Sequence, residues 1–271
     1  MTGMVKKQIA NISLVMAIGA VWYWLRAVDE RLGDAAILSG WLLLSAYVGL
    51  MLLWIRKRIY ARRWGRVAGW LALHRRLGWF AAAVFMMHIG WPIEGRFEQV
   101  LAMSFLVVTA TGILVSIASR TVPRRLLALP TDYRWEQIPA LQRQVAQQAH
   151  CQAIASASFD EGATLAEFYH TQLLPFFQGS RSWLYVAWPS GSRRRRLVGQ
   201  LHQLRRYLGP RGKEVEQTLA RLVQQKDDLD YHYALQRRLR VAYAAHVALT
   251  WALGMMIAAH VVLALRFQGA W

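Results

Sequence analysis

The chain's 271 residues are 55% hydrophobic and 18% charged, with 13 tryptophans, a composition typical of a small integral membrane protein and not of a soluble enzyme. Its net charge of +18 mostly borders apolar segments, where Lys and Arg report topology and contact anionic lipid; no recognition motif accompanies it, so we expect no nucleic-acid partner. The single cysteine, Cys151, excludes an internal disulfide, a thiolate-held iron–sulfur cluster and a covalently attached c-type haem.

Five apolar segments follow one another along the chain, and each is long enough to cross the hydrocarbon core of a bilayer. They cover residues 9–25, 35–55, 67–93, 100–118 and 241–265. The first is rich in tryptophan and lacks a small-residue cleavage signal, so we expect a retained helix in place of a removed signal peptide. The fourth contains Thr109, Thr111 and Gly112, which allow close helix contact. The sequence therefore predicts an all-α membrane protein with five transmembrane helices.

The distribution of charge predicts the orientation of these helices. The link between the second and third segments is strongly basic, whereas residues 94–99 between the third and fourth contain one Arg and two Glu. The basic residues of the first of these links are Arg56, Lys57, Arg58, Arg62, Arg63 and Arg66. The positive-inside rule places that link in the cytoplasm, and the basic residues at Lys6, Lys7, Arg120, Arg124 and Arg125 agree. We expect a multi-pass protein of a bacterial inner membrane, with a cytoplasmic N-terminus and an external C-terminus.

Two segments share one design: His74 and His88 in the third, and His246 and His260 in the fifth, are each fourteen positions apart. On an α-helix this spacing covers about 21 Å and falls roughly 40° short of four whole turns, so both imidazoles point from nearly one face. Because both segments run outward, His74 shares a depth with His246 near the cytoplasm, and His88 with His260 near the outer side. Imidazole is a usual axial ligand of haem iron, and bundle cofactors are held between facing helices. The pattern predicts two stacked b-type haems in a four-helix core.

A simpler interpretation is that each histidine hydrogen-bonds at a helix contact, as single polar residues in membrane helices do. The repeated spacing favours haem. His232 also lies fourteen positions before His246, but it stands among acidic residues outside the apolar segment. Tyr60 occupies the matching position before His74, so His232 has no partner ligand. The four histidines within the apolar segments are therefore the expected iron ligands.

Small and basic residues accompany these histidines. Gly78 lies one turn after His74, and Gly254 lies between the two histidines of the fifth segment. Such residues let a flat macrocycle lie against the backbone, although they also line ordinary helix contacts. Arg75 and Arg76 directly follow His74, where guanidinium groups can pair with haem propionates or mark the inner boundary of the membrane. These four residues are the expected contacts of the cofactor.

Residues 120–240 form a polar, basic region that separates the helices of 1–119 from the last transmembrane helix in 241–271. We expect this region to be a mostly helical cytoplasmic insertion. Helical patterns cover 141–157 and 165–177, and a strand followed by a turn is predicted over 183–188. From Lys213 one long helix is expected to continue through Val241 into the membrane.

No dinucleotide-binding, phosphate-loop or metal-ligand motif occurs in this region. Its isolated histidines, His150, His170 and His202, are expected to be solvated. Arg193 to Arg196, with Arg205 and Arg206, form a basic patch. It is either a solvated or lipid-contacting face or a docking surface for an acidic redox partner.

The arrangement of histidines resembles that of di-haem membrane cytochromes b. In the membrane domain of ferric reductases and NADPH oxidases, the third and fifth helices each carry two haem-ligand histidines at a similar spacing, and those roles would fall on His74, His88, His246 and His260. The haem-bearing helices of respiratory cytochrome b are also similar. The resemblance covers the second to fifth segments. It does not extend to a flavin and nicotinamide domain, and the Pro-Glu-Trp-Tyr motif of quinol oxidation is absent.

The resemblance implies transmembrane electron transfer through two bis-His haems, in an electron-transfer subunit of an oxidoreductase complex and not in a complete enzyme. The expected partners are membrane lipid and either a quinone or a redox subunit, which would be a flavoprotein, an iron–sulfur protein or a multihaem cytochrome. A haem-free membrane anchor or assembly subunit is the alternative. A transporter is disfavoured because the apolar segments contain almost no acidic residues.

Overall fold

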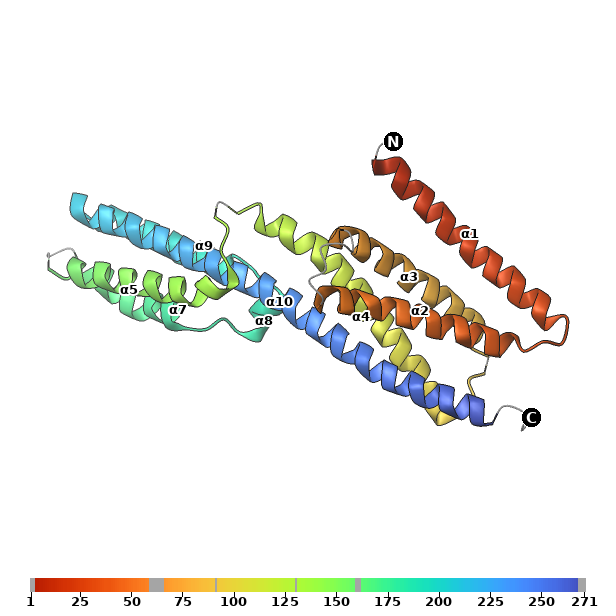
Figure 1. Ribbon diagram of the computed structural model, residues 1–271. Coiled ribbons are helices and arrows are strands. Elements are labelled where there is room, and N and C mark those ends of the chain that lie inside the picture. The colour runs from red at the N-terminus through yellow and green to blue at the C-terminus, as the bar shows by residue number, and fades with distance from the viewer. Residues whose placement is uncertain (1–2, 59–65, 91, 130, 159–161, 268–271) are drawn as a thin grey trace. The chain divides into compact units, whose positions relative to one another are not determined.

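The computed structural model describes residues 3–58, 66–90, 92–129, 131–158 and 162–267, and within these ranges every regular element is helical (Figure 1). The predicted all-α class is therefore confirmed. The long helices are α1 (Gly3–Asp29), α2 (Ala35–Arg58), α3 (Val67–His88), α4 (Arg96–Leu126) and α10 (Pro210–Arg266). The shorter helices are α5 (Ile138–Ser156), α6 (Gly162–Phe168), α7 (Leu174–Gln178), α8 (Trp183–Ala187) and α9 (Ser192–Leu204). Tyr60, Arg62 and Arg63, which entered the sequence argument, lie outside the described residues.

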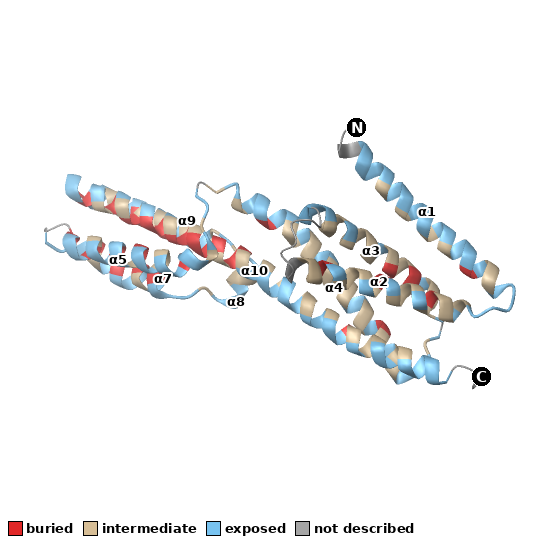
Figure 2. Cartoon of the chain, viewed as in Figure 1, coloured by how far each residue is buried: buried red, intermediate tan, exposed pale blue. Residues whose placement is uncertain are grey.

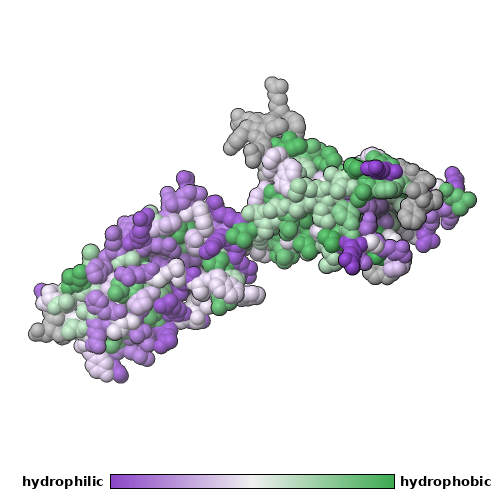
Figure 3. All heavy atoms as spheres, turned by 90° about the horizontal axis from the view of Figure 1, so that it is seen from below, coloured by the Kyte–Doolittle hydropathy of each residue, from purple (hydrophilic) through white to green (hydrophobic). Residues whose placement is uncertain are grey.

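The chain forms two compact units, residues 1–116 with 245–271, and residues 117–244. On the face seen in Figure 3, the residues of the first unit are mainly hydrophobic and those of the second mainly hydrophilic. Large apolar side chains such as Val15, Leu114 and Val262 are exposed on the helices of the first unit. Side chains of this kind are stable at a helix surface when lipid surrounds it.

Four helices among the described residues are long and apolar enough to cross a membrane, as a multi-pass membrane protein requires. They lie within Val5–Asp29, Ala35–Arg56, Arg96–Leu126 and Pro210–Arg266. α3 is not among them, although it has 22 residues, because His74, Arg75 and Arg76 interrupt its apolar sequence. The third predicted span, residues 67–93, thus stays a prediction.

α2, α3, α4 and the last part of α10 form one bundle in the first unit. α2 packs closely along α3, and α1 contacts both. Phe85 of α3 stacks on Phe105 of α4, with ring centroids 4.1 Å apart. The Tyr47 hydroxyl of α2 donates a hydrogen bond to the Thr250 carbonyl of α10 over 2.9 Å. These contacts hold α3 and α10 in the same bundle, so that their side chains can approach each other.

α3 contains both of its histidines in one uninterrupted helix. It begins after Arg66 and ends at His88, since the backbone of Ile89 is extended (φ −75°, ψ 117°) and its amide donates to the Phe85 carbonyl. His88 is therefore the last residue of the helix that carries His74.

α10 is a single helix of 57 residues, which corresponds to about 86 Å. It belongs to the second unit up to Ala244 and to the first unit from Ala245. The predicted continuation of one helix from Lys213 through Val241 is confirmed. His246 and His260 lie in the part that belongs to the first unit.

The second unit has a conventional apolar core, formed by α5, α6, α7, α9 and α10 (Figure 2). The fully buried side chains at its centre include Leu165, Tyr169, Phe176, Leu201 and Leu229. The predicted helices over 141–157 and 165–177 correspond to α5 and to α6 with α7, which a π-helical turn at Tyr169–Leu173 connects.

The strand predicted over 183–188 is wrong, because α8 occupies Trp183–Ala187. Ser182 stands immediately before this helix, and its side chain accepts a hydrogen bond from the Tyr185 backbone amide at 3.4 Å. Serine at this position satisfies an amide that the first turn of a helix leaves unpaired. This cap, together with the shortness of the aromatic run, explains why a helix forms where the residue types alone favour a strand.

A buried ion-pair network crosses the second unit. The Arg181 guanidinium contacts Asp227 at 2.7 Å and Asp230 at 2.6 Å, and Lys226 pairs with Asp230 as well. Burial raises the pKa of Asp227 and lowers the pKa of Lys226, and the neighbouring opposite charges act against both shifts. Because removal of one partner from a buried pair leaves an uncompensated charge, we expect this network to hold Arg181 firmly against α10.

Candidate functional site

The four predicted iron ligands all belong to the first unit. His74 and His88 lie on α3, His246 and His260 lie on α10, and all four side chains are half-buried. His74 and His88 are separated along α3 by about 21 Å, because fourteen residues each rise about 1.5 Å. The same separation applies to His246 and His260 on α10.

His88 and His260 lie beside each other. Their ring centroids are 6.4 Å apart and their planes are nearly perpendicular, at 88°. On α4, the Phe97 ring is also 6.4 Å from His260 and lies more nearly parallel to it, at 24°. The structure thus brings together the pair of histidines that the sequence assigned to the outer depth.

The spacing of this pair suits a metal ion held between the rings. A metal held in line by two imidazoles lies about 2 Å from each nitrogen, and each nitrogen lies about 1 Å from its ring centre, so the centres are about 6 Å apart. The observed 6.4 Å is close to that value. Ordinary ring pairs without a metal have centroids about 4.5–7 Å apart, so the observed distance is compatible with both arrangements.

The Nδ1 atom of His88 is held by a hydroxyl from the neighbouring helix α2. Ser39 Oγ lies 2.9 Å from this nitrogen and also donates to the Ala36 carbonyl at 2.9 Å. A serine hydroxyl has one proton. When that proton goes to Ala36, the oxygen accepts from His88, which is the tautomer with the hydrogen on Nδ1 and the lone pair on Nε2. Metal-binding histidines usually have this arrangement, with the second ring nitrogen donating to an acceptor.

His246 has the same arrangement with a hydroxyl from α4. Thr111 Oγ1 lies 3.1 Å from His246 Nδ1 and donates to the Val108 carbonyl at 2.9 Å. The hydroxyl proton is again committed to a carbonyl one turn earlier, so Thr111 accepts from His246. The Nε2 lone pair of His246 is then available to a metal.

A glycine follows each of these hydroxyl residues and gives the imidazole room. A Cβ atom on Gly40 would lie 3.3 Å from His88 Cε1, and one on Gly112 would lie 3.0 Å from His246 Cε1. Both distances are shorter than ordinary carbon–carbon contact, which is about 3.5–4.0 Å. Ser39-Gly40 on α2 and Thr111-Gly112 on α4 therefore serve two histidines in the same way.

Sequence reasoning missed these four residues as parts of the site. Thr111 and Gly112 were expected only at a helix contact, and Ser39 and Gly40 were not singled out. A signal does exist, because a hydroxyl residue followed by glycine occurs in two apolar segments that carry no histidine. The role of this hydroxyl–glycine pattern can be recognised only when it is known which helices are neighbours.

The predicted cofactor contacts lie on the same two helices as the histidines. Arg75 and Arg76 are half-buried on α3 directly after His74, and a Cβ atom on Gly78 would meet no atom within 4 Å. Gly254 of α10 instead accommodates the Tyr47 hydroxyl of α2. The open space beside Gly78 is compatible with the predicted role, whereas Gly254 has a protein neighbour of its own. Contact of these four residues with haem stays a prediction.

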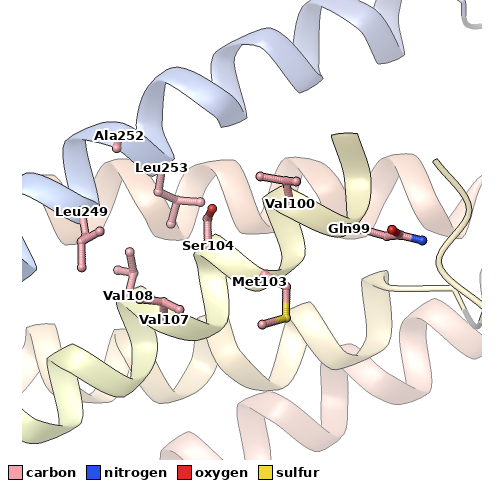
Figure 4. Close-up of a pocket in the computed structure, with 9 residues that line it drawn as sticks. All are labelled: Gln99, Val100, Met103, Ser104, Val107, Val108, Leu249, Ala252 and Leu253. Carbon is pink, nitrogen blue, oxygen red and sulfur yellow. The ribbon is translucent and has the colours of Figure 1, made fainter. Parts of the chain in front are cut away.

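An apolar cavity of about 420 Å³ lies between α4 and α10 in the first unit (Figure 4). From α10 it is lined by Leu249, Ala252 and Leu253, which fall between His246 and His260. The lining residues of α4 are Gln99, Val100, Met103, Ser104, Val107 and Val108. α4 and α10 are thus not closely packed at the depth between the two histidines of α10.

The remaining histidines lie in the second unit. His150, His170 and His202 are exposed, as predicted. His232 is fully buried, and its ring meets Tyr133 edge-on at a centroid distance of 5.0 Å. It belongs to residues 117–244 and not to the unit that contains the four predicted ligands.

The predicted basic patch is partly neutralised within the second unit. Arg194 approaches Asp227 at 3.6 Å and Asp228 at 3.5 Å, and Arg205 approaches Glu216 at 3.8 Å. Arg193, Arg195, Arg196 and Arg206 are exposed. The surface that remains for a partner is therefore smaller than the sequence indicated.

Comparisons of the chain with protein-family models, with curated proteins and with solved structures found no match. Within the described ranges, no three side chains of His, Cys, Asp or Glu gather into a group that could hold a metal ion unaided. A b-type haem needs no such group, because the macrocycle supplies the other ligands and the protein supplies only the axial ones.

Proposed function

We propose that this chain is a membrane cytochrome b subunit that carries electrons across a bilayer through two bis-His haems. The observation that carries the proposal is the pairing of His88 with His260, whose ring centroids are 6.4 Å apart. The two residues are 172 positions apart in the sequence, and they are the pair that the predicted topology assigns to one depth. An accidental contact between two helices would not explain why the residues that meet are two histidines from the two equally spaced pairs.

In this proposal the residues have three roles: binding haem iron, holding the histidine rings and excluding water. His88 and His260 bind the outer haem, and His74 and His246 bind the inner one. Ser39 and Thr111 hold two of the four rings, and the apolar helix faces exclude water. Haem iron exchanges single electrons, and two axial imidazoles leave no open position on it, which favours electron transfer over chemistry at the metal.

The orientation of the two haem sites in the membrane follows from the proposed topology. With the N-terminus in the cytoplasm of a bacterial cell, His74 and His246 lie near the inner side of the membrane, and the second unit is cytoplasmic. Electrons are exchanged with a quinone or with a flavoprotein, iron–sulfur or multihaem partner subunit. A soluble acidic partner would meet Arg195, Arg196 and Arg206, which are exposed on the second unit.

One observation favours a second candidate, a haem-free anchor or assembly subunit. His88 bonds to Ser39 of α2 and His246 to Thr111 of α4, and such hydrogen bonds between helices stabilise membrane bundles without any cofactor. This candidate gives no role to the second ring nitrogen of either histidine. It also leaves the repeated spacing of fourteen residues unexplained.

The test is the optical spectrum of the purified protein before and after reduction by dithionite. We expect the sharp bands of low-spin b-type haem. His88→Ala and His260→Ala should each remove the same portion of the spectrum and leave the rest. His170→Ala, an exposed histidine in the second unit, is the matched control and should change nothing. A parent protein without haem bands would contradict the proposal and favour the haem-free anchor.

A further inference from the structure

We propose that Ser39 and Thr111 are positioning residues that set the reduction potentials of the two haem irons independently, Ser39 through His88 and Thr111 through His246. This inference rests on the proposed function and adds to it. It assigns a role to two residues on α2 and α4, helices that contribute no iron ligand.

The hydroxyls of Ser39 and Thr111 each contact one backbone carbonyl and one histidine. Ser39 is almost fully buried, with 1% of its surface exposed, so water does not compete for its hydroxyl. Its proton goes to the Ala36 carbonyl at 2.9 Å, and the Thr111 proton goes to the Val108 carbonyl at 2.9 Å. Each oxygen is left with lone pairs, and the nearest group able to use one is the Nδ1–H of a histidine.

A hydrogen bond at Nδ1 changes the chemistry of the whole imidazole ring. Donation from Nδ1 fixes the tautomer that leaves Nε2 bare, and it increases electron density on the ring and hence the basicity of Nε2. A more basic axial ligand stabilises ferric iron relative to ferrous iron. Hydrogen bonds of this kind are one of the means by which a protein tunes a haem. Loss of the hydroxyl should therefore raise the midpoint potential of the haem concerned.

The two hydroxyls act on separate histidines. Ser39 and Thr111 lie on different helices and bond to histidines assigned to different haems. Each is followed by a glycine that brings the backbone close to the same imidazole. The same contact of a hydroxyl with a histidine thus occurs twice, and a substitution can remove one contact without affecting the other.

The experiment is a redox titration of the full-length protein with its bound haems, followed by optical absorbance and by electron paramagnetic resonance. The test variants are Ser39→Ala and Thr111→Val. Ser45→Ala and Thr109→Val are matched controls, because Ser45 and Thr109 lie on the same two helices and donate only to their own backbone, at Trp41 and Phe105. Ser39→Thr and Thr111→Ser keep the hydroxyl and should restore parental behaviour.

We expect Ser39→Ala to raise one midpoint potential and shift the signal of one ferric haem, and Thr111→Val to do the same to the other. Haem affinity at the altered site should fall by about 10- to 100-fold, as for other changes around a metal ligand. Complete loss of one haem, restored by the hydroxyl-retaining variant, would also support the role.

Two results would overturn the inference in distinguishable ways. If both haems are present in Ser39→Ala and Thr111→Val with unchanged potentials and unchanged resonance signals, the hydroxyls have no positioning role, while the proposed function stands. If the parent protein binds no haem, the proposed function itself fails. Equal shifts of both haems in either variant would refute independent tuning.

Discussion

Gly112→Ala offers the most quantitative test of the site. A Cβ atom at this position would lie 3.0 Å from His246 Cε1, whereas ordinary carbon–carbon contact requires about 3.5 Å or more. The imidazole would therefore have to move by about 0.5 Å, more than the roughly 0.2 Å tolerated in metal–ligand distances. Overpacking of this kind costs about 1–3 kcal/mol. Haem should bind the His74/His246 site about 5- to 150-fold more weakly.

Gly40→Ala provides a graded comparison at the other site. Its Cβ atom would lie 3.3 Å from His88 Cε1, so the overlap is only about 0.2 Å and the His88/His260 haem should be weakened less. Gly19→Ala on α1 is the control, because nothing lies within 4 Å of the added atom. The assay is the transfer of haem from each variant to a competing haem-binding protein, followed by absorbance.

The reasoning would be refuted if Gly112→Ala retained both haems as firmly as Gly19→Ala does. It would also be refuted if Gly112→Ala weakened the haem that His88→Ala removes. Either result would mean that His246 does not lie against Gly112 when haem is bound.

Further predictions concern both units. Gly78→Ala should leave the fold intact, since nothing lies within 4 Å of the new atom, but should lower haem content if the macrocycle lies there; parental haem content would remove Gly78 from the site. Burial lowers the pKa of His232 in the folded state, against the opposing charges of Asp132 and Asp228. In the unfolded chain the pKa of His232 is about 6.5, so below that pH the unfolded chain binds more protons than the folded one. The free energy of unfolding of the second unit should therefore decrease by up to about 1.4 kcal/mol per pH unit as the pH falls from about 6.5 towards the folded pKa. His232→Leu should remove this loss in hydrogen-exchange measurements and leave both haem spectra intact; an unchanged pH dependence would contradict the assignment. Arg181→Met should destabilise the second unit by about 3–5 kcal/mol, because Asp227 and Asp230 lose a buried partner, whereas the exposed Arg195→Met should have little effect on protease resistance; equal resistance would refute a structural role for the pairs. A periplasmic reporter fused after Gly191 should be inactive and one fused at the C-terminus active, and the reverse pattern would invert the proposed electron path.

The helices were predictable because membrane-spanning sequence has a strong and simple signal. Long apolar runs indicated α1, α2, α4 and the end of α10, and the unbroken helical pattern after Lys213 indicated the length of α10. The signal is weaker for short segments. At 183–188 an aromatic run favoured a strand, but the run is short and the Ser182 cap supports the first turn of α8.

The pairing of His88 with His260 was predictable for a different reason. Two equal spacings and a charge asymmetry together determine which histidines share a depth, and neither requires knowledge of the packing. The roles of Ser39, Gly40, Thr111 and Gly112 did require it, because each residue acts on a histidine of another helix. Gly254 illustrates the same limit, since its neighbour Tyr47 lies more than 200 positions away in the chain.

The measurement that tests the central proposal most directly is the number of haems per chain. The protein would be purified from membranes in detergent, and its haem quantified by the pyridine haemochrome assay against protein concentration. We expect two haems per chain, both extractable by acidified organic solvent because Cys151 is the only cysteine and cannot form a c-type attachment pair. A value near zero in haem-replete cells would contradict the account, and a value near one would remove one of the two histidine pairs from it.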